Sequence, residues 1–323
     1  MKKRMKVYLD NAATTKCDRR VTEAMLPFFT EKYAVASSEF SHSPGIEAGE
    51  AIGNARKIIA DSIGAKPDEV IFTSGGTESN NYAIKGVARA NRNKGNHIIS
   101  SAVEHRSIQE SLITLQNEGF KITILPVSRN GLIAPDMLKK SIKKNTIMVS
   151  IQQANQETGV IQDINSIGRI CKTRGILFHT DSAQSFGRIP IDVKKSNIDL
   201  LTITAHKIHG ELLSNKDTQY IKILKKRLLS GIKKKLNNIK LNGLVTNTLP
   251  NILNITFRYV EGESILLHLD LKGIAVTTGS ACFSRSLEPS YVLRAMGRNH
   301  EESHGSIRVK SFLNILSILK TSG

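Results

Sequence analysis

The chain has 323 residues and carries 46 lysines and arginines against 28 acidic residues, which gives a formal net charge of +18. Its three cysteines include no CxxC pair, so they indicate neither a disulfide framework nor a structural zinc site. No apolar stretch approaches the roughly 20 residues that a membrane-spanning helix needs. The composition therefore excludes membrane-spanning, collagen-like and wholly disordered proteins, and it predicts a globular, cytoplasmic protein of about two domains.

Short β-branched runs alternate with helical patterns along the first two thirds of the chain, which predicts βαβ units. The predicted strands are 70–74, 97–101, 122–127, 147–152, 175–181 and 199–205. The predicted helices are 49–63, 78–91, 108–117, 135–142 and 164–174. We expect an α/β fold with a mostly parallel central sheet, helices on both faces, and a smaller α+β domain after Pro250. The large domain is expected at residues 15–250, and the small one combines residues 1–14 and 251–323.

Much of the positive charge falls on residues 216–240, where nine lysines or arginines stand against one acid. Apolar residues recur in this stretch at helical spacing: Ile221, Leu224, Leu228, Ile232 and Leu236. The pattern predicts an amphipathic helix whose lysines face water, rather than a site for tRNA or an acidic partner. An aromatic fraction of 5% without tryptophan also offers few stacking platforms, so we expect no direct nucleic-acid partner.

A glycine-rich turn joins the first predicted strand to its helix. Gly75, Gly76 and Thr77 stand there, where backbone N–H groups and the helix dipole favour an anion. The segment is interpreted either as a phosphate-binding turn or as an ordinary Ser/Thr-capped helix start.

An acid and a lysine follow neighbouring predicted strands near the middle of the chain. Asp181 ends one strand, and Lys207 comes shortly after the next. A pyridoxal phosphate site requires this pair, because the lysine forms a Schiff base with the cofactor and the carboxylate keeps the pyridine nitrogen protonated. The carboxyl ends of parallel strands meet at the ligand-binding edge of an open sheet, which favours that interpretation.

One of the three cysteines has the surroundings of a nucleophile. Cys282 lies among small residues in the run TGSACFS at 278–284, which predicts a mobile loop. Cys17 in an N-terminal turn and Cys171 on the apolar face of a helix are interpreted as structural.

These residues belong to a set of motifs that resembles the cysteine desulfurases of the NifS and IscS type. The motifs occur in that family's order: YLDNAATT (8–15), FTSGGTESNN (72–81), VEH (103–105), HTDSAQSFGRIPID (179–192), TITAHKIHG (202–210), LPNILNITF (249–257), YVEGES (259–264), TGSACFSRSLEPSYVLRAMG (278–297) and HGSIR (304–308). The resemblance covers nearly the whole chain up to Arg308. It implies a pyridoxal-phosphate-dependent, fold-type-I enzyme of the class V aminotransferase family.

The resemblance also implies a role for each site residue. Lys207 would form the Schiff base, Asp181 would pair with the pyridine nitrogen, and His105 would stack on the ring and relay protons. Gln184 would hydrogen-bond the ring hydroxyl. Gln156 would also contact the cofactor, with an amide on a longer side chain than the family's usual asparagine. The residues implied at the phosphate are Gly76, Thr77, Thr204 and His206.

The implied substrate is L-cysteine, bound through Arg308 and Asn155. Its sulfur would pass to Cys282 as a persulfide, with L-alanine as the other product, for iron–sulfur cluster assembly or tRNA thiolation. A selenocysteine lyase is an alternative within the same fold. The resemblance further implies a homodimer, a sulfur-acceptor or iron–sulfur scaffold protein as partner, and no resident metal, with Cys282 as a possible transient iron–sulfur ligand.

Two segments depart from the family pattern. After Gly210 the chain lacks several dozen residues, including a further sheet strand and a segment that reaches the cofactor phosphate of the neighbouring subunit. The C-terminus is shortened after HGSIRV. We expect the central sheet to be incomplete beside the strand that precedes Lys207. A degenerate, non-catalytic homologue that acts as a binding or scaffold protein is therefore the second hypothesis.

Overall fold

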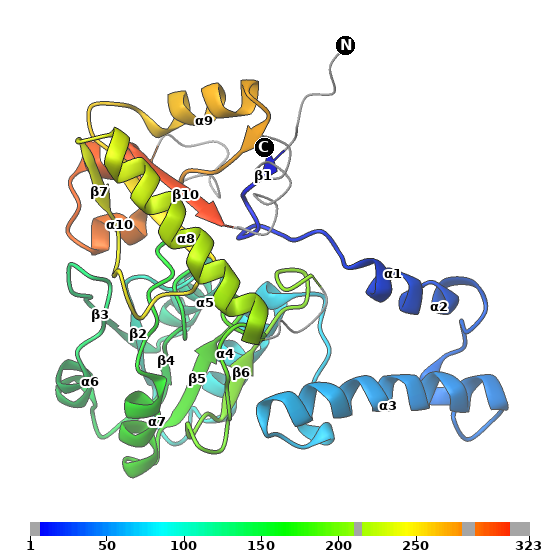
Figure 1. Cartoon of the computed structure of the whole chain (residues 1–323). Helices are drawn as coiled ribbons and strands as arrows, with labels where there is room; N and C mark the ends of the chain where they lie inside the picture. Colours follow the sequence, from blue (N-terminus) through cyan, green and yellow to red (C-terminus); the bar gives the residue numbers. More distant parts are fainter. Residues whose placement is uncertain (1–6, 210–214, 280–287, 311–323) are drawn as a thin grey trace.

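The computed structural model describes residues 7–209, 215–279 and 288–310. A central sheet of five parallel strands forms the larger unit, and two small sheets lie beside it (Figure 1). In spatial order the central strands are β3 (Lys121–Leu125), β2 (His97–Ser101), β4 (Thr146–Ser150), β5 (Leu177–Asp181) and β6 (Leu200–Thr202). The predicted α/β fold with a mostly parallel sheet is confirmed.

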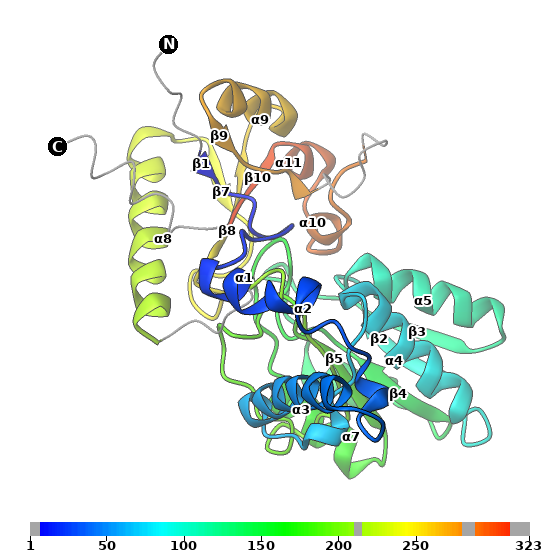
Figure 2. The same ribbon diagram turned by 90° about the vertical axis from the view of Figure 1, so that its right-hand side faces the viewer.

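Helices cover both faces of this sheet (Figure 2). They are α3 (Ser43–Ile63), α4 (Gly76–Ala90), α5 (Arg106–Asn117), α6 (Pro135–Ser141) and α7 (Ile164–Thr173). Alternate residues of a strand point to opposite faces. Ile98 and Met148 accordingly pack with α4 and α5, whereas Ile99 and Val149 pack with α6 and α7. The five predicted helices and the strands from 97 onward are therefore found, with shifted ends at most of them.

The predicted strand at residues 70–74 is not formed. The short 3₁₀ helix η2 (Pro67–Glu69) precedes this stretch, and the side chains of Ile71 and Phe72 are 62% and 48% exposed. A β-strand needs a neighbour that shares its backbone hydrogen bonds. Among the described residues, β6 is the edge of the central sheet and no strand lies beyond it. The sheet is thus incomplete beside the strand that leads to Lys207, as the missing segment after Gly210 predicts.

The second unit contains two small sheets. One pairs β1 (Val7–Tyr8) in parallel with β9 (Ile274–Ala275). The other is antiparallel, in the order β10 (Ser306–Lys310), β8 (Ile252–Phe257) and β7 (Ile239–Leu241). The helices of this unit are α8 (Asn215–Lys235), α9 (Gly262–Leu271), α10 (Tyr291–Ala295) and α11 (His300–His304).

Helix α8 is the predicted amphipathic helix. Its buried residues Ile221 and Leu224 share a core with β8 and β10, while Lys222 and Lys233–Lys235 are exposed. The lysine-rich face is therefore solvated, as predicted. Because α8 and β7 pack on the small sheet, we propose that the boundary between the two units falls before α8 rather than near residue 250.

One lysine of α8 is an exception to the solvated face. The Nζ atom of Lys225 donates hydrogen bonds to Thr248 Oγ1 at 2.8 Å and to the Leu249 carbonyl at 2.9 Å. Burial lowers the pKa of this amine to about 8.

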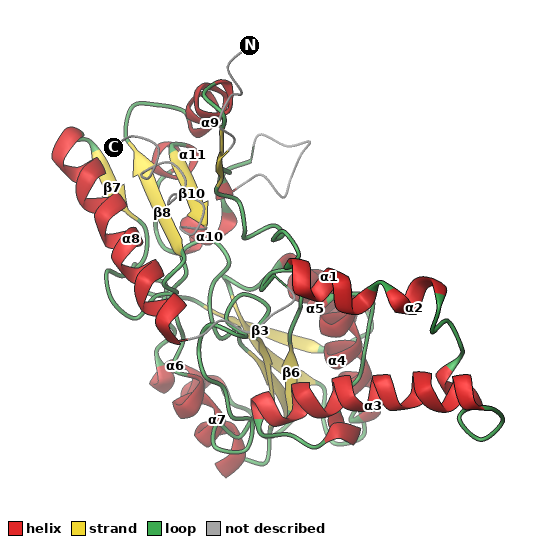
Figure 3. Cartoon of the chain, turned by 45° about the vertical axis from the view of Figure 1, so that its right-hand side comes forward, coloured by secondary structure: helices red, strands yellow, loops and turns green. Residues whose placement is uncertain are grey.

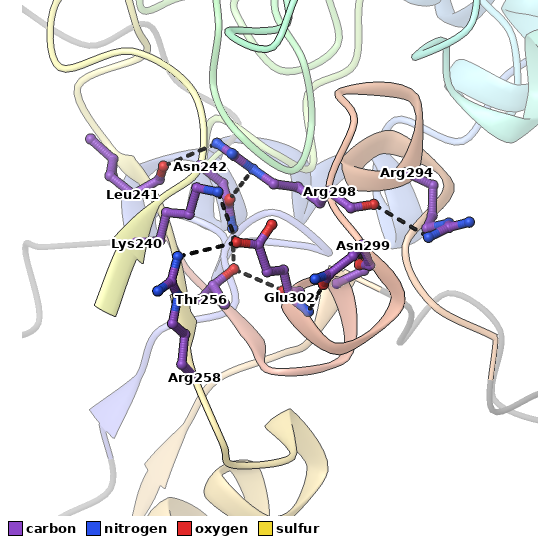
Figure 4. Close-up of polar contacts among 10 residues, drawn as sticks. Lys240, Leu241, Asn242, Thr256, Arg258, Arg294, Arg298, Asn299 and Glu302 are labelled. Carbon is purple, nitrogen blue, oxygen red and sulfur yellow. Dashed lines mark hydrogen bonds and ion pairs between the residues drawn. The ribbon is translucent and has the colours of Figure 1, made fainter. Parts of the chain in front are cut away.

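Ion pairs and hydrogen bonds tie α11 to the small antiparallel sheet (Figure 4). The Glu302 carboxylate accepts a hydrogen bond from Lys240 Nζ at 2.8 Å and lies 3.5 Å from the Arg258 guanidinium. Nearby, Arg298 Nε donates to Asn242 Oδ1 at 2.9 Å. The turn between α10 and α11 is thereby fixed against β7.

The N-terminal helices lie apart from both units. Helices α1 (Arg19–Met25) and α2 (Pro27–Thr30) and the 3₁₀ helix η1 (Ala36–Ser38) lead into α3, and α2 and the start of α3 extend beyond the sheet (Figure 3). No helix in the described ranges has the length and apolarity to cross a membrane.

The packing of α7 against the backbone at Ser196 can be tested at Gly168. A Cβ atom added to Gly168 would lie 1.9 Å from the backbone oxygen of Ser196, so we expect Gly168→Ala to cost about 1–3 kcal/mol of stability in urea unfolding. Gly86 of α4 has open space at the same point, so Gly86→Ala is the control and should stabilise the fold by about 0.5–1 kcal/mol. Equal effects of the two substitutions would contradict the packing described for α7.

Candidate active site

The carboxyl ends of β5 and β6 bring the predicted acid close to the predicted lysine. Asp181 is the last residue of β5, and Lys207 lies in the turn that follows β6. The charges of both residues act on the His105 imidazole, so the three groups lie within electrostatic range of one another. The structure therefore gathers the central residues that the motifs predict.

Asp181 is buried and held by two donors. Its Oδ2 accepts a hydrogen bond from Asn80 Nδ2 at 2.9 Å, and its Oδ1 accepts one from the Ala183 N–H at 2.9 Å. Asn80 also donates to Ser107 Oγ at 2.9 Å. The carboxylate is thus fixed in one orientation, as a partner of a ring nitrogen must be.

Asn80 is a site residue to which the motif comparison gave no role. It lies on the first turns of α4, after the glycine-rich turn, and its Oδ1 atom is buried without a hydrogen-bond partner. No signal in the sequence pointed to this role, because the burial of Asn80 and its hydrogen bonds to Asp181 and Ser107 arise only in the folded chain.

His105 caps the N-terminus of α5. Its Nδ1 accepts the N–H of Ser107 at 3.2 Å and contacts Ser107 Oγ at 2.8 Å. Burial lowers the pKa of the imidazole, and Lys207 lowers it further, while Asp181 raises it. The ring is therefore neutral at pH 7, with its proton on Nε2.

The glycine-rich turn lies against the end of β6. A Cβ atom on Gly76 would come within 4.0 Å of Thr204, and Thr77 follows in the first turn of α4. Gly75, the N-cap residue, provides no side-chain hydrogen bond to the helix, and His206 reaches Thr14 through an Nδ1 to Oγ1 contact of 3.1 Å. Gly76, Thr77 and Thr204 thus lie at a helix N-terminus, which suits a phosphate group.

Gln184 and Arg308 lie on either side of the N-terminal segment. Gln184 Nε2 donates to the Ala12 carbonyl at 3.2 Å. Arg308 pairs with Asp10 at 3.0 Å and donates to the Gln156 carbonyl at 3.3 Å. The Nε atom of Arg308 is buried and has no partner among the described residues, so the guanidinium retains capacity for an anion.

The loop at residues 155–159 follows β4 and holds Asn155 and Gln156. Asn155 Oδ1 accepts hydrogen bonds from the N–H groups of Glu157 and Thr158, both at 2.9 Å, and Asn155 Nδ2 donates to the Val103 carbonyl at 3.1 Å. Most of the Asn155 amide therefore shapes the loop. The second N–H of its Nδ2 has no partner among the described residues.

Gln156 contributes an amide that is half satisfied. Its Nε2 donates to the Tyr291 hydroxyl at 3.0 Å, and its Oε1 is buried without a partner in the described part of the chain. Cofactor-binding sites contain such orphaned polar atoms before the ligand is added. Together with the fixed carboxylate of Asp181 and the phosphate-type turn, they fit pyridoxal phosphate.

The ends of the cysteine segment meet at Glu157. Its Oε2 accepts a hydrogen bond from Ser290 Oγ at 2.5 Å, and a Cβ atom on Gly279 would lie 2.3 Å from the same oxygen. Cys282 itself lies outside the described residues. Glu157 thus binds one flank of the segment that contains Cys282 and packs closely against the other.

The other two cysteines differ in exposure. Cys171 is a residue of α7 and is buried in the core of the larger unit. Burial raises the pKa of its thiol to about 12, in agreement with the structural interpretation. Cys17 is exposed and has no disulfide partner among the described cysteines.

The burial of Glu157 predicts a pH dependence of stability. Burial raises the pKa of this carboxyl to about 7, against 4.5 when exposed. Between these values the folded chain holds a proton that the unfolded chain releases, so stability falls as the pH rises, by up to about 1.4 kcal/mol per pH unit. Burial raises the pKa of Glu104 to about 8, which adds a slope of the same sign. Glu157→Gln should therefore lower the slope in urea titrations between pH 4.5 and 7 by the share that Glu157 contributes.

The partly exposed Glu118 provides the control for that experiment. The Arg89 guanidinium lowers the pKa of Glu118. The pH dependence of stability that Glu118 contributes is therefore confined to pH values below about 4.5. Glu118→Gln should therefore leave the slope above pH 4.5 as it is in the wild type. A Glu157→Gln protein with the wild-type slope would show that Glu157 is ionised in the folded chain.

Comparison with known proteins places this geometry in a family. The aminotransferase class-V family matches residues 7–212 and 211–314. The cysteine desulfurase IscS of Dictyoglomus turgidum is 44% identical over 350 aligned positions, which cover 94% of this chain and 88% of the relative. The IscS of Methanosarcina thermophila is 42% identical, with 94% and 86% of the two chains covered.

The same comparison confirms the missing segment. The two stretches that match the family meet at residues 211–212. An alignment of 350 positions with a chain of 323 residues leaves at least 27 positions of the Dictyoglomus turgidum protein without a counterpart.

Solved structures agree on the fold. A NifS-like protein has a TM-score of 0.87 at 28% identity, with 98% of each chain covered. A structure of SspA in complex with cysteine has a TM-score of 0.84 at 28% identity, over 95% of this chain and 99% of the other. The chain therefore belongs to the class V aminotransferase family and, within it, to the cysteine desulfurases, which use pyridoxal phosphate.

Proposed function

We propose that this chain converts L-cysteine to L-alanine and retains the sulfur as a persulfide on Cys282, for transfer to an iron–sulfur scaffold protein or to a tRNA-thiolation acceptor. The observation that supports this most directly is the convergence of Lys207, Asp181 and His105 at one edge of the sheet, despite the missing segment. The identity to curated cysteine desulfurases supports the same substrate.

The site residues divide the work between holding the cofactor and holding the substrate. When bound, pyridoxal phosphate supplies an electron sink for the substrate carbon atoms. Asp181 would hold the pyridine nitrogen protonated, and His105 would cover the ring. Gln184 and Gln156 would contact the ring substituents, and the phosphate would lie among Gly76, Thr77, Thr204 and His206.

The substrate is oriented by its carboxylate. The Arg308 guanidinium would bind it through two parallel hydrogen bonds, with the remaining N–H of Asn155 as a further donor. Lys207 would then carry the proton that leaves the substrate Cα. The Cys282 thiolate attacks the substrate sulfur, so that an S–S bond forms as the Cβ–S bond breaks and alanine is released.

We further propose a cytoplasmic homodimer. Large apolar side chains are exposed on the N-terminal arm that extends from the body (Figure 3): Phe29 is 71%, Tyr33 79% and Phe40 93% exposed. Contiguous apolar surface of this kind is typical of an interface.

A non-catalytic homologue that acts as a scaffold is the second candidate. The exposed, unpaired segment at residues 70–74 favours it, because this segment leads directly into the glycine-rich turn at Gly76. A phosphate turn supported on one side only would hold the cofactor more weakly.

Replacement of the nucleophile tests the proposed activity. Cys282→Ala should retain the visible absorbance of the bound cofactor and lose sulfide release from cysteine by at least about 100-fold, since the acceptor thiolate is gone. Cys17→Ala, which removes an exposed thiol outside the motif at 278–284, should keep the wild-type rate. Unchanged turnover by Cys282→Ala would refute its role as the sulfur acceptor.

Cofactor uptake separates the enzyme from the scaffold. Purified protein with added pyridoxal phosphate should gain a visible absorbance band, and Lys207→Ala should not gain it, because the band requires the Schiff base. Wild-type protein that remains colourless, with no alanine formed from cysteine and a reductant, would favour the non-catalytic homologue.

A further inference from the structure

A second lysine is buried at the predicted active site. Lys310 is the last residue of β10 and is fully buried. Residues two apart on a strand share a face, so its side chain leaves β10 on the same side as that of Arg308. Neither the motifs nor the proposed reaction assigns it a role.

The backbone of Lys310 is fixed by the N-terminal segment. Its N–H donates to the Leu9 carbonyl at 2.7 Å, and its carbonyl accepts the N–H of Asn11 at 2.9 Å. Three and four residues after Asn11, the same segment reaches Thr14 and Thr15, whose hydroxyls donate to the carbonyl of His206. The position of Lys310 is therefore coupled to the turn that contains Lys207.

The surroundings of the Lys310 amine are predominantly cationic. Besides burial, the charges that lower its pKa come from Arg188 after β5, Lys207 after β6 and Arg308 on its own strand, whereas Asp10 acts in the opposite direction. His206 also lies within range of its charge. Burying an amine among cations destabilises a fold, so packing alone gives no reason for a lysine at this position.

The hydrogen-bond partner of the amine is the Gln184 amide. Lys310 Nζ donates to Gln184 Oε1, while Gln184 Nε2 donates to the Ala12 carbonyl at 3.2 Å. An amide presents an acceptor at one end and two donors at the other. With Oε1 held by the amine, both N–H groups of the amide lie on Nε2, and the Ala12 carbonyl accepts only one of them.

We propose that Lys310 is a positioning residue that holds the Gln184 amide with Nε2 directed at the ring oxygen of the cofactor. This inference rests on the proposed contact between Gln184 and that oxygen. Without the amine, the amide loses the partner of its oxygen and turns more freely. The ring oxygen then loses a fixed donor, which alters the protonation of the bound cofactor.

The test is a pH titration of the visible absorbance of the resting holoenzyme, without substrate. Lys310→Met and Gln184→Leu should each shift the titration midpoint by about one pH unit or more in the same direction, corresponding to a tenfold change in the proton equilibrium. The double variant should shift no further than Gln184→Leu alone, since both substitutions remove one interaction. Lys310→Arg, which keeps a donor, should restore most of the wild-type midpoint.

Lys225→Met is the matched control, because Lys225 is a buried lysine with hydrogen bonds to Thr248 and Leu249 in the other unit. It should lower the melting temperature without moving the midpoint. If Lys310→Met behaves in the same way, or if the shifts of Lys310→Met and Gln184→Leu add, the proposal is wrong. If Gln184→Leu itself causes no shift, the contact assigned to Gln184 is wrong, while the activity assigned to Cys282 is untouched.

Discussion

The short segment from Leu9 to Thr15, which turns at residues 11–13, is the element on which the site depends. Its backbone bonds to β9 through the Ala275 carbonyl, to β10 at Lys310 and to the lysine turn at His206. The Ala12 carbonyl of this segment also accepts a hydrogen bond from Gln184 Nε2. Backbone hydrogen bonds in a buried position are expensive to break, because each lost partner leaves a desolvated group. The two units are therefore held in register at the point where substrate and cofactor residues must meet.

Charge is distributed around this segment in an ordered way. Asp181 and Lys207 both act on the His105 imidazole, and the charges of Lys207 and Arg308 also reach the buried Lys310 amine. A substrate with a carboxylate and a cofactor with a phosphate would both bring negative charge to these cations. Binding of these anions would relieve the repulsion among the buried cations. The free chain is therefore less stable than the liganded chain, and the difference contributes to the affinity for anions.

Much of the fold could be predicted from local patterns. The strand at 97–101 is found at its predicted bounds, because both of its faces are buried and two β-branched isoleucines follow its first residue. The segment at 70–74 has the same local preference and fails, since a strand also needs a distant partner that the sequence cannot guarantee. The pairing of Asp181 with Lys207 could be predicted because both follow strands of one parallel sheet. Asn80 and Lys310 could not be assigned, because their roles depend on contacts across about 100 residues or more of chain.

The short edge strand has a consequence for how this chain behaves at high concentration. An open sheet edge invites other chains to add their own strands. Here β6 offers three residues, Leu200–Thr202, and the chain turns away after them. An edge of this length provides too few donors and acceptors to template a growing β-assembly. Although the central sheet has lost a strand, the edge strand β6 is therefore too short to promote amyloid-like stacking.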